Sequence, residues 1–447
     1  MARTRRSRQH EDVLALTVGS RWAHRRVRFV EWVRDRFWFI PILLVLWGIL
    51  TAVVVAYPDV LGLPQDLGSG HAVRTSTADT MLGVMSSSML TFVGVVFAIT
   101  LVGLQLASSQ LSPRVIRTFV RSGVTKVAFG FFLATFAFAV TGLAIDAVTD
   151  PATATRTVVV SMAMLAAAVA IFVVYVTSTM RLLEVGWVIT AVAHEARAAI
   201  RRGYPPAEAY VEADPPALVE HPHVTHLSSR DSRTYRGVLG TVLGVDRPRL
   251  VRLATEHDCV IEILPRVGEY VVTGGPVLAV HGRPPPEPEL LTCVDLGRAR
   301  TLYQDPTFGI RQLVDVATQA LSPAINQPTT AVLVIDRLHD LLLRIARLPT
   351  PTGLHVDTAG TVRLVEPTHS WADLLHLAFA EIMALGIASP HVTRRLMAAL
   401  TDLAADVPAD AEPEVAEVRA ALDLLLRDHA TVGFTGLATT PDRLGLG

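Results

Sequence analysis

The densest group of side chains that could do chemistry lies between residues 305 and 329. It contains the runs Asp305-Pro-Thr-Phe-Gly-Ile-Arg-Gln-Leu-Val-Asp and Ser322-Pro-Ala-Ile-Asn-Gln-Pro-Thr. Its polar members are two acids, an arginine, two amides and two hydroxyls: Asp305, Arg311, Gln312, Asp315, Ser322, Asn326 and Thr329. Nucleophilic catalysis needs a base beside the nucleophile, and no histidine stands near this group in the sequence. We therefore interpret the group as mainly structural, with a ligand or partner surface as the alternative and no catalytic residue assigned.

Two helices must position this group. The apolar residues Ile310, Leu313, Val314, Ala317 and Leu321 recur at helical spacing, which places Arg311, Gln312 and Asp315 toward the other side of the first helix. Pro323 should end that helix, and a second should begin near Pro328 and run to about residue 345. We expect Asn and Ser to cap at the corner and Arg311 to pair with an acid.

The histidines and the single lysine of the chain do not indicate a metal or cofactor site. His221, His223 and His226 form a histidine cluster, but no cysteine or carboxylate accompanies them at a usual zinc spacing. Of the 40 basic residues, Lys126 is the single lysine. A Walker phosphate loop, a Schiff-base lysine and a biotin or lipoate attachment site are therefore excluded from the soluble part. We expect no enzyme activity, no metal and no cofactor.

Half of the chain's residues are hydrophobic, and long apolar stretches concentrate near its N-terminus. Four of them can cross roughly 30 Å of hydrocarbon as helices. A basic, amphipathic N-terminal arm at residues 1–36 precedes them and carries ten arginines against four acids. By the positive-inside rule, we expect a multi-pass protein of a bacterial inner membrane with both termini in the cytoplasm. The predicted spans of the transmembrane domain at residues 37–180 are about 37–57, 80–106, 127–148 and 158–180.

The second predicted span differs from the others because small and polar residues share one side of it. At 100° per residue, these positions fall on one face: Gly83, Ser87, Thr91, Gly94, Ala98, Gln105 and Ser109. The face either packs against other helices or lines an oligomeric pore. A basic elbow follows with Arg114, Arg117 and Arg121, which the orientation places at the inner mouth. No ionisable residue lies at mid-depth, which argues against a proton-coupled pump.

The soluble part should be of the α+β class. We expect a cytosolic helix and loop at 181–234, a small β domain at 235–283, a mainly helical domain at 289–432 with one hairpin near 357–360, and a loose tail at 433–447. The glycine and valine spacing from Gly268 through Val271 and Gly274 to Leu278 resembles the small sandwich of biotinyl and lipoyl domains, here without the modified lysine. Arginines are interspersed with acids, so no nucleic-acid partner is expected.

The runs around residues 305–315 and 320–331 together resemble the hallmark of the domain-of-unknown-function 2254 family of bacterial predicted membrane proteins. In that family a DP-x-FG-x-RQ-x-VD-x-A helix precedes an A-L-S-P-x-I-N-D-P-x-T-A turn. The order of the spans and the basic elbow also fit, so the resemblance covers nearly the whole chain and implies a membrane location. Gln327 stands where the family commonly has Asp, so a function that needs that acid should be lost here, whereas a helix cap should survive.

The preferred function hypothesis is a homo-oligomeric, channel-like pore in the lipid bilayer with a cytosolic assembly or gating domain. The alternative is a non-transporting membrane scaffold or sensor whose cytosolic domain binds a protein or a small ligand. Both hypotheses use the small-residue face of the second span, as a pore lining in the first and as a packing surface in the second.

Overall fold

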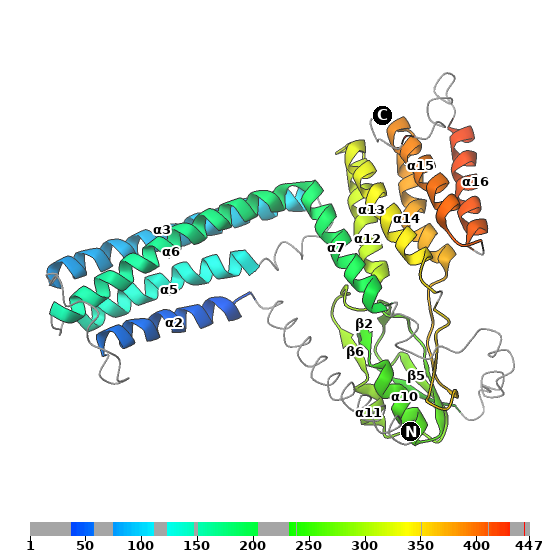
Figure 1. Ribbon diagram of the computed structural model, residues 1–447, viewed down its shortest axis with the longest axis horizontal. Coiled ribbons are helices and arrows are strands. Elements are labelled where there is room, and N and C mark those ends of the chain that lie inside the picture. The colour runs from blue at the N-terminus through cyan, green and yellow to red at the C-terminus, as the bar shows by residue number, and fades with distance from the viewer. Residues whose placement is uncertain are drawn as a thin grey trace, which may run out of the picture. The chain divides into compact units, whose positions relative to one another are not determined.

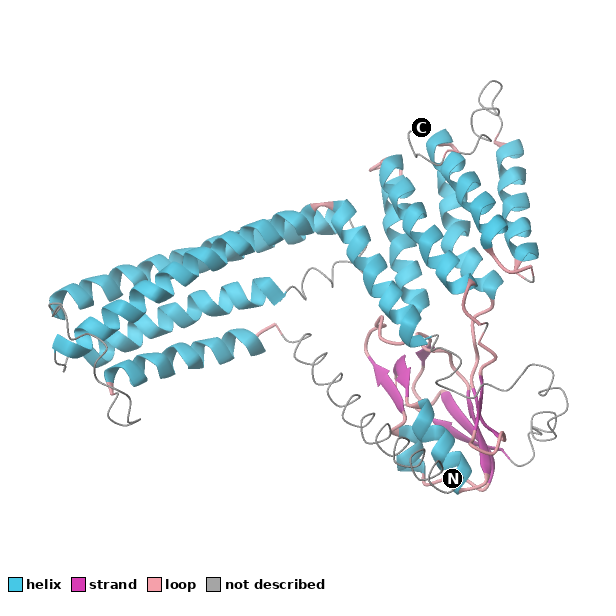
Figure 2. Ribbon diagram, viewed as in Figure 1, coloured by secondary structure: helices cyan, strands magenta, loops and turns pink. Residues whose placement is uncertain are grey.

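A computed structural model describes residues 37–57, 75–110, 123–146, 151–203, 232–237, 239–349, 351–409, 411–429 and 442. The chain divides into two compact units, one ending at Glu184 and the other beginning at Val185. In the described residues, the first unit consists of long helices, and the second combines shorter helices with strands (Figures 1 and 2).

The first unit holds four helices that are long and apolar enough to cross a membrane, which confirms the predicted spans. Each contains an 18-residue stretch whose mean hydropathy lies between 2.1 and 2.7. The shortest has 18 residues, or about 27 Å at the rise of an α-helix, close to the thickness of a hydrocarbon core. The four are α2 (Phe39–Ala56), α3 (Thr75–Gln110), α5 (Gly123–Asp146) and α6 (Pro151–Leu183).

Glycines allow α2 and α5 to approach closely. A Cβ at Gly48 would overlap the carbonyl group of Ala134, and a Cβ at Gly130 would lie 2.9 Å from the Cα of Pro41. Small residues at such crossings bring helix backbones together, which is the main source of helix association within lipid. The α2–α5 pair therefore depends on these two glycines.

Aromatic side chains and one hydroxyl network join α3 to α5 and α6. Phe92 stacks on Phe132 with ring centroids 5.6 Å apart, and its edge meets Phe172 at 5.0 Å. The hydroxyl of Tyr175 donates to the carbonyl oxygen of Val96 at 2.9 Å. These contacts fix which side of α3 faces the rest of the unit.

The helices of the second unit have apolar faces that pack on one another. Gly309 lies where α12 crosses α7, so close that a Cβ there would overlap Ala196. Arg197 of α7 also donates to Asp340 of α13 at 2.9 Å. Glu184 separates α7 from α6, so the cytosolic helix predicted from residue 181 begins at Val185. The helices are α7 (Val185–Gly203), α12 (Pro306–Leu321), α13 (Pro328–Ala346), α14 (Trp371–Gly386), α15 (Pro390–Asp406) and α16 (Glu412–Asp428).

The strands form two sheets. The five-stranded sheet has the order β1-β5-β3-β8-β7 and the three-stranded sheet has the order β4-β2-β6. Leu250, Ile261 and Leu278 lie in their shared apolar core. The elements are β1 (Ser232–Arg236), β2 (Gly240–Val245), α10 (Arg247–Glu256), β3 (Cys259–Ile263), β4 (Tyr270–Val271), β5 (Pro276–Gly282), α11 (Glu287–Leu291), β6 (Val294–Gly297), β7 (Leu354–Val356) and β8 (Val362–Val365).

The expected biotinyl- or lipoyl-like fold is not confirmed, because the described strands do not close into a barrel. The predicted hairpin near residues 357–360 is present as β7 and β8, but it joins the main sheet. β8 lies parallel to β3 with Ile261 opposite Leu364, and β6 pairs with β2. Strands from beyond residue 283 therefore complete both sheets, which local sequence patterns do not reveal.

Gly268, in the turn before β4, is a position where glycine is required. Its φ is +93°, and a Cβ would overlap the carboxylate of Asp305 and lie 2.6 Å from Nε of Arg300. Gly360 has a similar φ of +82° but nothing within 4 Å of its Cβ position. The two glycines thus share the left-handed backbone and differ in the space around it.

We expect Gly268→Ala to lower the free energy of unfolding by about 1–3 kcal/mol more than Gly360→Ala, because only the former adds a steric overlap to the backbone cost. Urea denaturation of the full-length protein in detergent micelles, followed by circular dichroism, measures the difference. Equal losses in the two variants would contradict the proposed contact with Asp305.

Candidate functional site

The small-residue face of α3 points away from the other helices of its unit. Gly83, Ser87, Thr91, Gly94, Ala98 and Gln105 are all exposed, whereas Leu82, Met85, Met89 and Val96 on the other side are buried. Nothing lies within 4 Å of a Cβ built on Gly83 or Gly94. The face therefore does not pack against the chain's own described spans.

The polar groups of this face are satisfied locally. The hydroxyl of Ser87 donates to the carbonyl oxygen of Val84 at 2.9 Å, and that of Thr91 donates to the carbonyl oxygen of Ser87 at 3.1 Å. Ser109 belongs to α3, but its side chain lies outside the described part of the chain, as do Arg114, Arg117 and Arg121. His221, His223 and His226 also lie outside it.

Asp305 begins α12 and organises a buried polar cluster. Its side chain, 2% exposed, accepts hydrogen bonds from the backbone N–H of Phe308 at 3.0 Å and the hydroxyl of Thr307 at 2.6 Å. Arg300 donates to both carboxylate oxygens and to Thr307. Because these donors occupy both oxygens, Asp305 acts as a helix cap and the partner of a buried ion pair.

Arg311 and Asp315 meet one turn apart on α12. Nε of Arg311 donates to Asp315 at 2.7 Å, and the two terminal nitrogens of Arg311 bind Glu381 of α14. The expected pairing of Arg311 with an acid is thus present, and it links α12 to α14. Gln312 lies on the same helix and is buried.

The remaining members of the predicted group surround the turn between α12 and α13. Ser322 follows α12 and donates to the carbonyl oxygen of Gln319 at 2.7 Å. Asn326 adopts the left-handed conformation with φ of 48°, which Asn tolerates better than most residues. Thr329 is exposed in the first turn of α13. The 16 residues of α12, about 24 Å, separate this turn from Asp305, so the group does not form one site.

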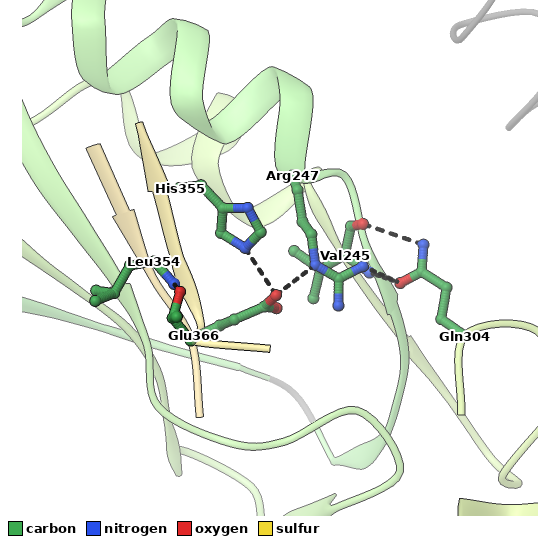
Figure 3. A network of polar contacts seen from close by, with 7 residues as sticks. Val245, Arg247, Gln304, Leu354, His355 and Glu366 are labelled. Carbon is green, nitrogen blue, oxygen red and sulfur yellow. Dashed lines mark hydrogen bonds and ion pairs between the residues drawn. The ribbon is translucent and has the colours of Figure 1, made fainter. Parts of the chain in front are cut away.

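A different polar network, which the sequence did not indicate, lies among the strands and the start of α10 (Figure 3). Glu366, just after β8, accepts hydrogen bonds through one oxygen from Nε of Arg247 at 2.6 Å and Nε2 of His355 at 2.8 Å. The side-chain amide of Gln304 pairs with both backbone groups of Val245, at 2.9 and 3.2 Å. Residues more than 100 positions apart in the sequence therefore converge here.

The environment of Glu366 sets its charge. Burial alone would raise the pKa of this carboxyl, but attraction to Arg247 and hydrogen bonds from His355 and Arg247 outweigh burial and lower the pKa to about 2. The group is therefore a carboxylate at neutral pH. Because its partners hold it in place, it is more suited to fixing Arg247 than to accepting a proton.

A cavity of about 80 Å³ opens beside this network. Arg247, Arg266, Gln304, Glu366 and His369 contribute polar groups to its wall. Arg266 is 39% exposed and donates from Nε to the carbonyl oxygen of Thr368 at 3.2 Å. Burial and the nearby Arg266 lower the pKa of His369. Within the described residues, no group of three His, Cys, Asp or Glu side chains is placed to hold a metal ion.

Four apolar helices followed by a unit of strands and helices define a multi-span membrane protein. The family model described as "Predicted membrane protein (DUF2254)" matches residues 34–402. The chain belongs to this family.

Two relatives are the uncharacterized proteins Mb1321c of Mycobacterium bovis and Rv1290c of Mycobacterium tuberculosis. Each is 28% identical to this chain over 405 residues, which cover 85% of this chain and 74% of the relative. No solved structure matches the chain significantly.

Glu366 predicts a pH dependence of stability. Because its pKa is lower in the folded protein, its stabilisation is complete above about pH 4.5 and is lost as the pH falls toward 2. The loss amounts to about 3 kcal/mol. In Glu366→Gln, the unfolding free energy should fall by about 3 kcal/mol less than in the wild-type protein as the pH is lowered from about 4.5 toward 2. Urea denaturation in detergent micelles at a series of pH values measures this difference. Glu256→Gln, at an exposed position, serves as the control, and equal acid limbs in both variants would contradict the assignment.

Proposed function

We propose that this protein is a homo-oligomeric, channel-like membrane protein whose subunits meet through the small-residue face of α3. The observation that carries the proposal is the exposure of this face, with no described residue near the Cβ positions of Gly83 and Gly94. Gly48 and Gly130, on α2 and α5, are by contrast in close contact within the chain. The pair α2 and α5 thus uses these glycines internally, and α3 offers Gly83 and Gly94 outward.

A second copy of the chain is the occupant that this face fits best. From Gly83 to Ala98 the face extends for about 22 Å along the helix, most of the hydrocarbon thickness. Two smooth helix faces in contact gain dispersion energy. A glycine-rich face gains less dispersion energy when it contacts mobile lipid chains instead. Ser87, Thr91 and Gln105 add polar atoms along the same line, which suits a water-filled path between copies.

The arrangement in the membrane follows from charge. Ten arginines precede the first span, so we place both termini on the cytoplasmic side of a bacterial inner membrane. The second unit then lies in the cytoplasm, on the same side as the basic elbow of Arg114, Arg117 and Arg121. In this proposal the second unit serves as the assembly or gating domain of the pore.

The alternative is a scaffold or sensor that does not transport. It is favoured by the hydrogen bonds that Ser87 and Thr91 make to their own helix, since hydroxyls satisfied in this way need no water. In this case the face still joins copies of the chain, but no path for ions exists between them.

Ala98→Leu tests the contact between copies. Ala98 is exposed on the α3 face, and Ala166 is exposed on α6 away from it, so Ala166→Leu adds the same atoms elsewhere. We expect Ala98→Leu to weaken self-association by about tenfold, because a bulky side chain keeps the helices apart. Light scattering from purified protein in nanodiscs measures the oligomeric state. A monomeric wild-type protein, or equal behaviour of the two variants, would refute the proposed interface.

Thr91→Leu tests conduction in planar bilayers. Thr91 and Thr177 are both exposed and both bond back to a carbonyl four residues earlier, so Thr177→Leu on α6 is a matched control. A pore lined by α3 predicts that Thr91→Leu changes single-channel conductance and that Thr177→Leu does not. An oligomer that conducts nothing under voltage, membrane tension or osmotic challenge favours the scaffold instead.

A further inference from the structure

The second unit contains two cavities that differ mainly in the charged side chains of their walls, and we call them polar and apolar for that reason. The polar cavity, about 80 Å³, is the one beside Arg247 and Glu366. The apolar cavity, about 350 Å³, lies at the end of α13 and the start of α14. Pro351 and His369 line both cavities, which are therefore neighbours.

The polar cavity carries donor groups that the protein does not use fully. Arg247 gives Nε to Glu366, and its Nη1 lies at a long 3.5 Å from Gln304. Arg266 gives Nε to the carbonyl oxygen of Thr368, and its Nη1 lies 3.7 Å from Glu269, which is half exposed. Each guanidinium therefore keeps N–H groups without a close partner among the described residues.

The wall of the polar cavity holds two arginines, Arg247 and Arg266, and two acids, Asp305 and Glu366, which differ in how closely they are paired. Glu366 forms an ion pair with Arg247 and a hydrogen bond with His355, and Asp305 forms an ion pair with Arg300, which lies outside the wall. Among the described residues, the ion pair of Arg266 is with Glu269, at a long 3.7 Å and exposed to solvent. An oxyanion placed in the cavity would therefore meet a guanidinium in the geometry that suits a carboxylate or phosphate.

The apolar cavity has the dimensions of a small-molecule site. Pockets that bind small molecules commonly occupy roughly 300–1,000 Å³ and are lined mainly by apolar side chains with a few polar groups. Trp371 forms part of the wall and is fixed by a hydrogen bond from its indole N–H to the carbonyl oxygen of Ala411 at 3.2 Å. The other apolar residues of the wall include Ile345, Leu348, Pro349, Leu374 and Pro408.

We propose that the second unit binds a small organic anion, with its oxyanion head held by Arg266, Arg247 and His369 and its apolar body in the cavity beside Trp371. The head is a carboxylate or a phosphate, since both accept two parallel hydrogen bonds from a guanidinium. This inference does not depend on whether α3 lines a pore. It gives the second unit a ligand to which the membrane unit could respond.

Four probes separate the parts of the proposal: 3-phenylpropionate, 3-phenylpropyl phosphate, 3-phenylpropan-1-ol and propionate. Isothermal titration calorimetry on the full-length protein in detergent micelles, with micelles alone as the blank, measures binding. At least one of the two phenyl-bearing anions should bind, and the tighter one identifies the head group. The neutral alcohol and propionate should each bind about tenfold more weakly or not at all. No binding by either anion, or equal binding by the alcohol, would overturn the proposal.

Two variants locate the site. Arg266→Gln should weaken binding of the anion by about tenfold or more, whereas Arg283→Gln, which removes the same charge from an exposed position outside both cavities, should leave it unchanged. Ala346→Phe, in the wall of the apolar cavity at the end of α13, should fill that space and abolish binding. Thermal unfolding confirms that each variant is folded. Unchanged affinity in both Arg266→Gln and Ala346→Phe would place the ligand elsewhere and refute the site.

Discussion

The second unit depends on satisfying one buried carboxylate. Asp305 is 2% exposed, and a carboxylate removed from water without partners would cost several kcal/mol. Its partners come from its own turn, through Phe308 and Thr307, and from the preceding loop, through Arg300. The turn at Gly268 packs directly over this pair, which only a residue without a side chain allows. The start of α12 is thereby fixed against the strands, and α12 in turn packs on α7, α13 and α14.

The residues just before Asp305 extend this constraint to the other network. Gln304 pairs with the backbone of Val245 at the end of β2 and lies near Arg247, which holds Glu366 after β8. Tyr303 accepts a hydrogen bond through its carbonyl oxygen from Arg202 of α7. A short loop thus ties one helix and both sheets to the start of α12. The charged groups around the polar cavity are consequently held in position before any ligand arrives, which lowers the entropic cost of binding one.

Local patterns in the sequence predicted what local interactions decide. The four spans, the helices α12 and α13, and the hairpin of β7 and β8 all follow from apolar periodicity, proline and capping residues, and each is present in the structure. The sheets were harder, because the pairing of β8 with β3 joins residues about 100 positions apart and leaves no periodic trace. The network of Arg247, Gln304, His355 and Glu366 was missed for the same reason: each residue alone is an ordinary polar side chain. The sequence showed that small and polar residues share one side of α3. It did not show which side of α3 faces the other spans, because that depends on the packing of Leu82 and Met89 with Tyr175 of α6.

The position of Gln327 bears on whether the hallmark turn does chemistry. Gln327 precedes α13 as its N-cap residue, yet its side chain caps no backbone N–H; the hydroxyl of Thr330 lies 3.5 Å from its amide oxygen. An aspartate at this position would be short enough to accept from the first turn of the helix, so the residue that the family commonly has here fits a capping role. The turn also lies about 24 Å from the N-terminus of α12, near which the charged groups of the second unit gather. The expectation that a helix cap survives at Gln327 is therefore wrong: the exchange of Asp for Gln removes the cap and leaves the charges that line the polar cavity intact. A function carried by Arg266 and His369 would survive this exchange, whereas one carried by an acid in the hallmark turn would not.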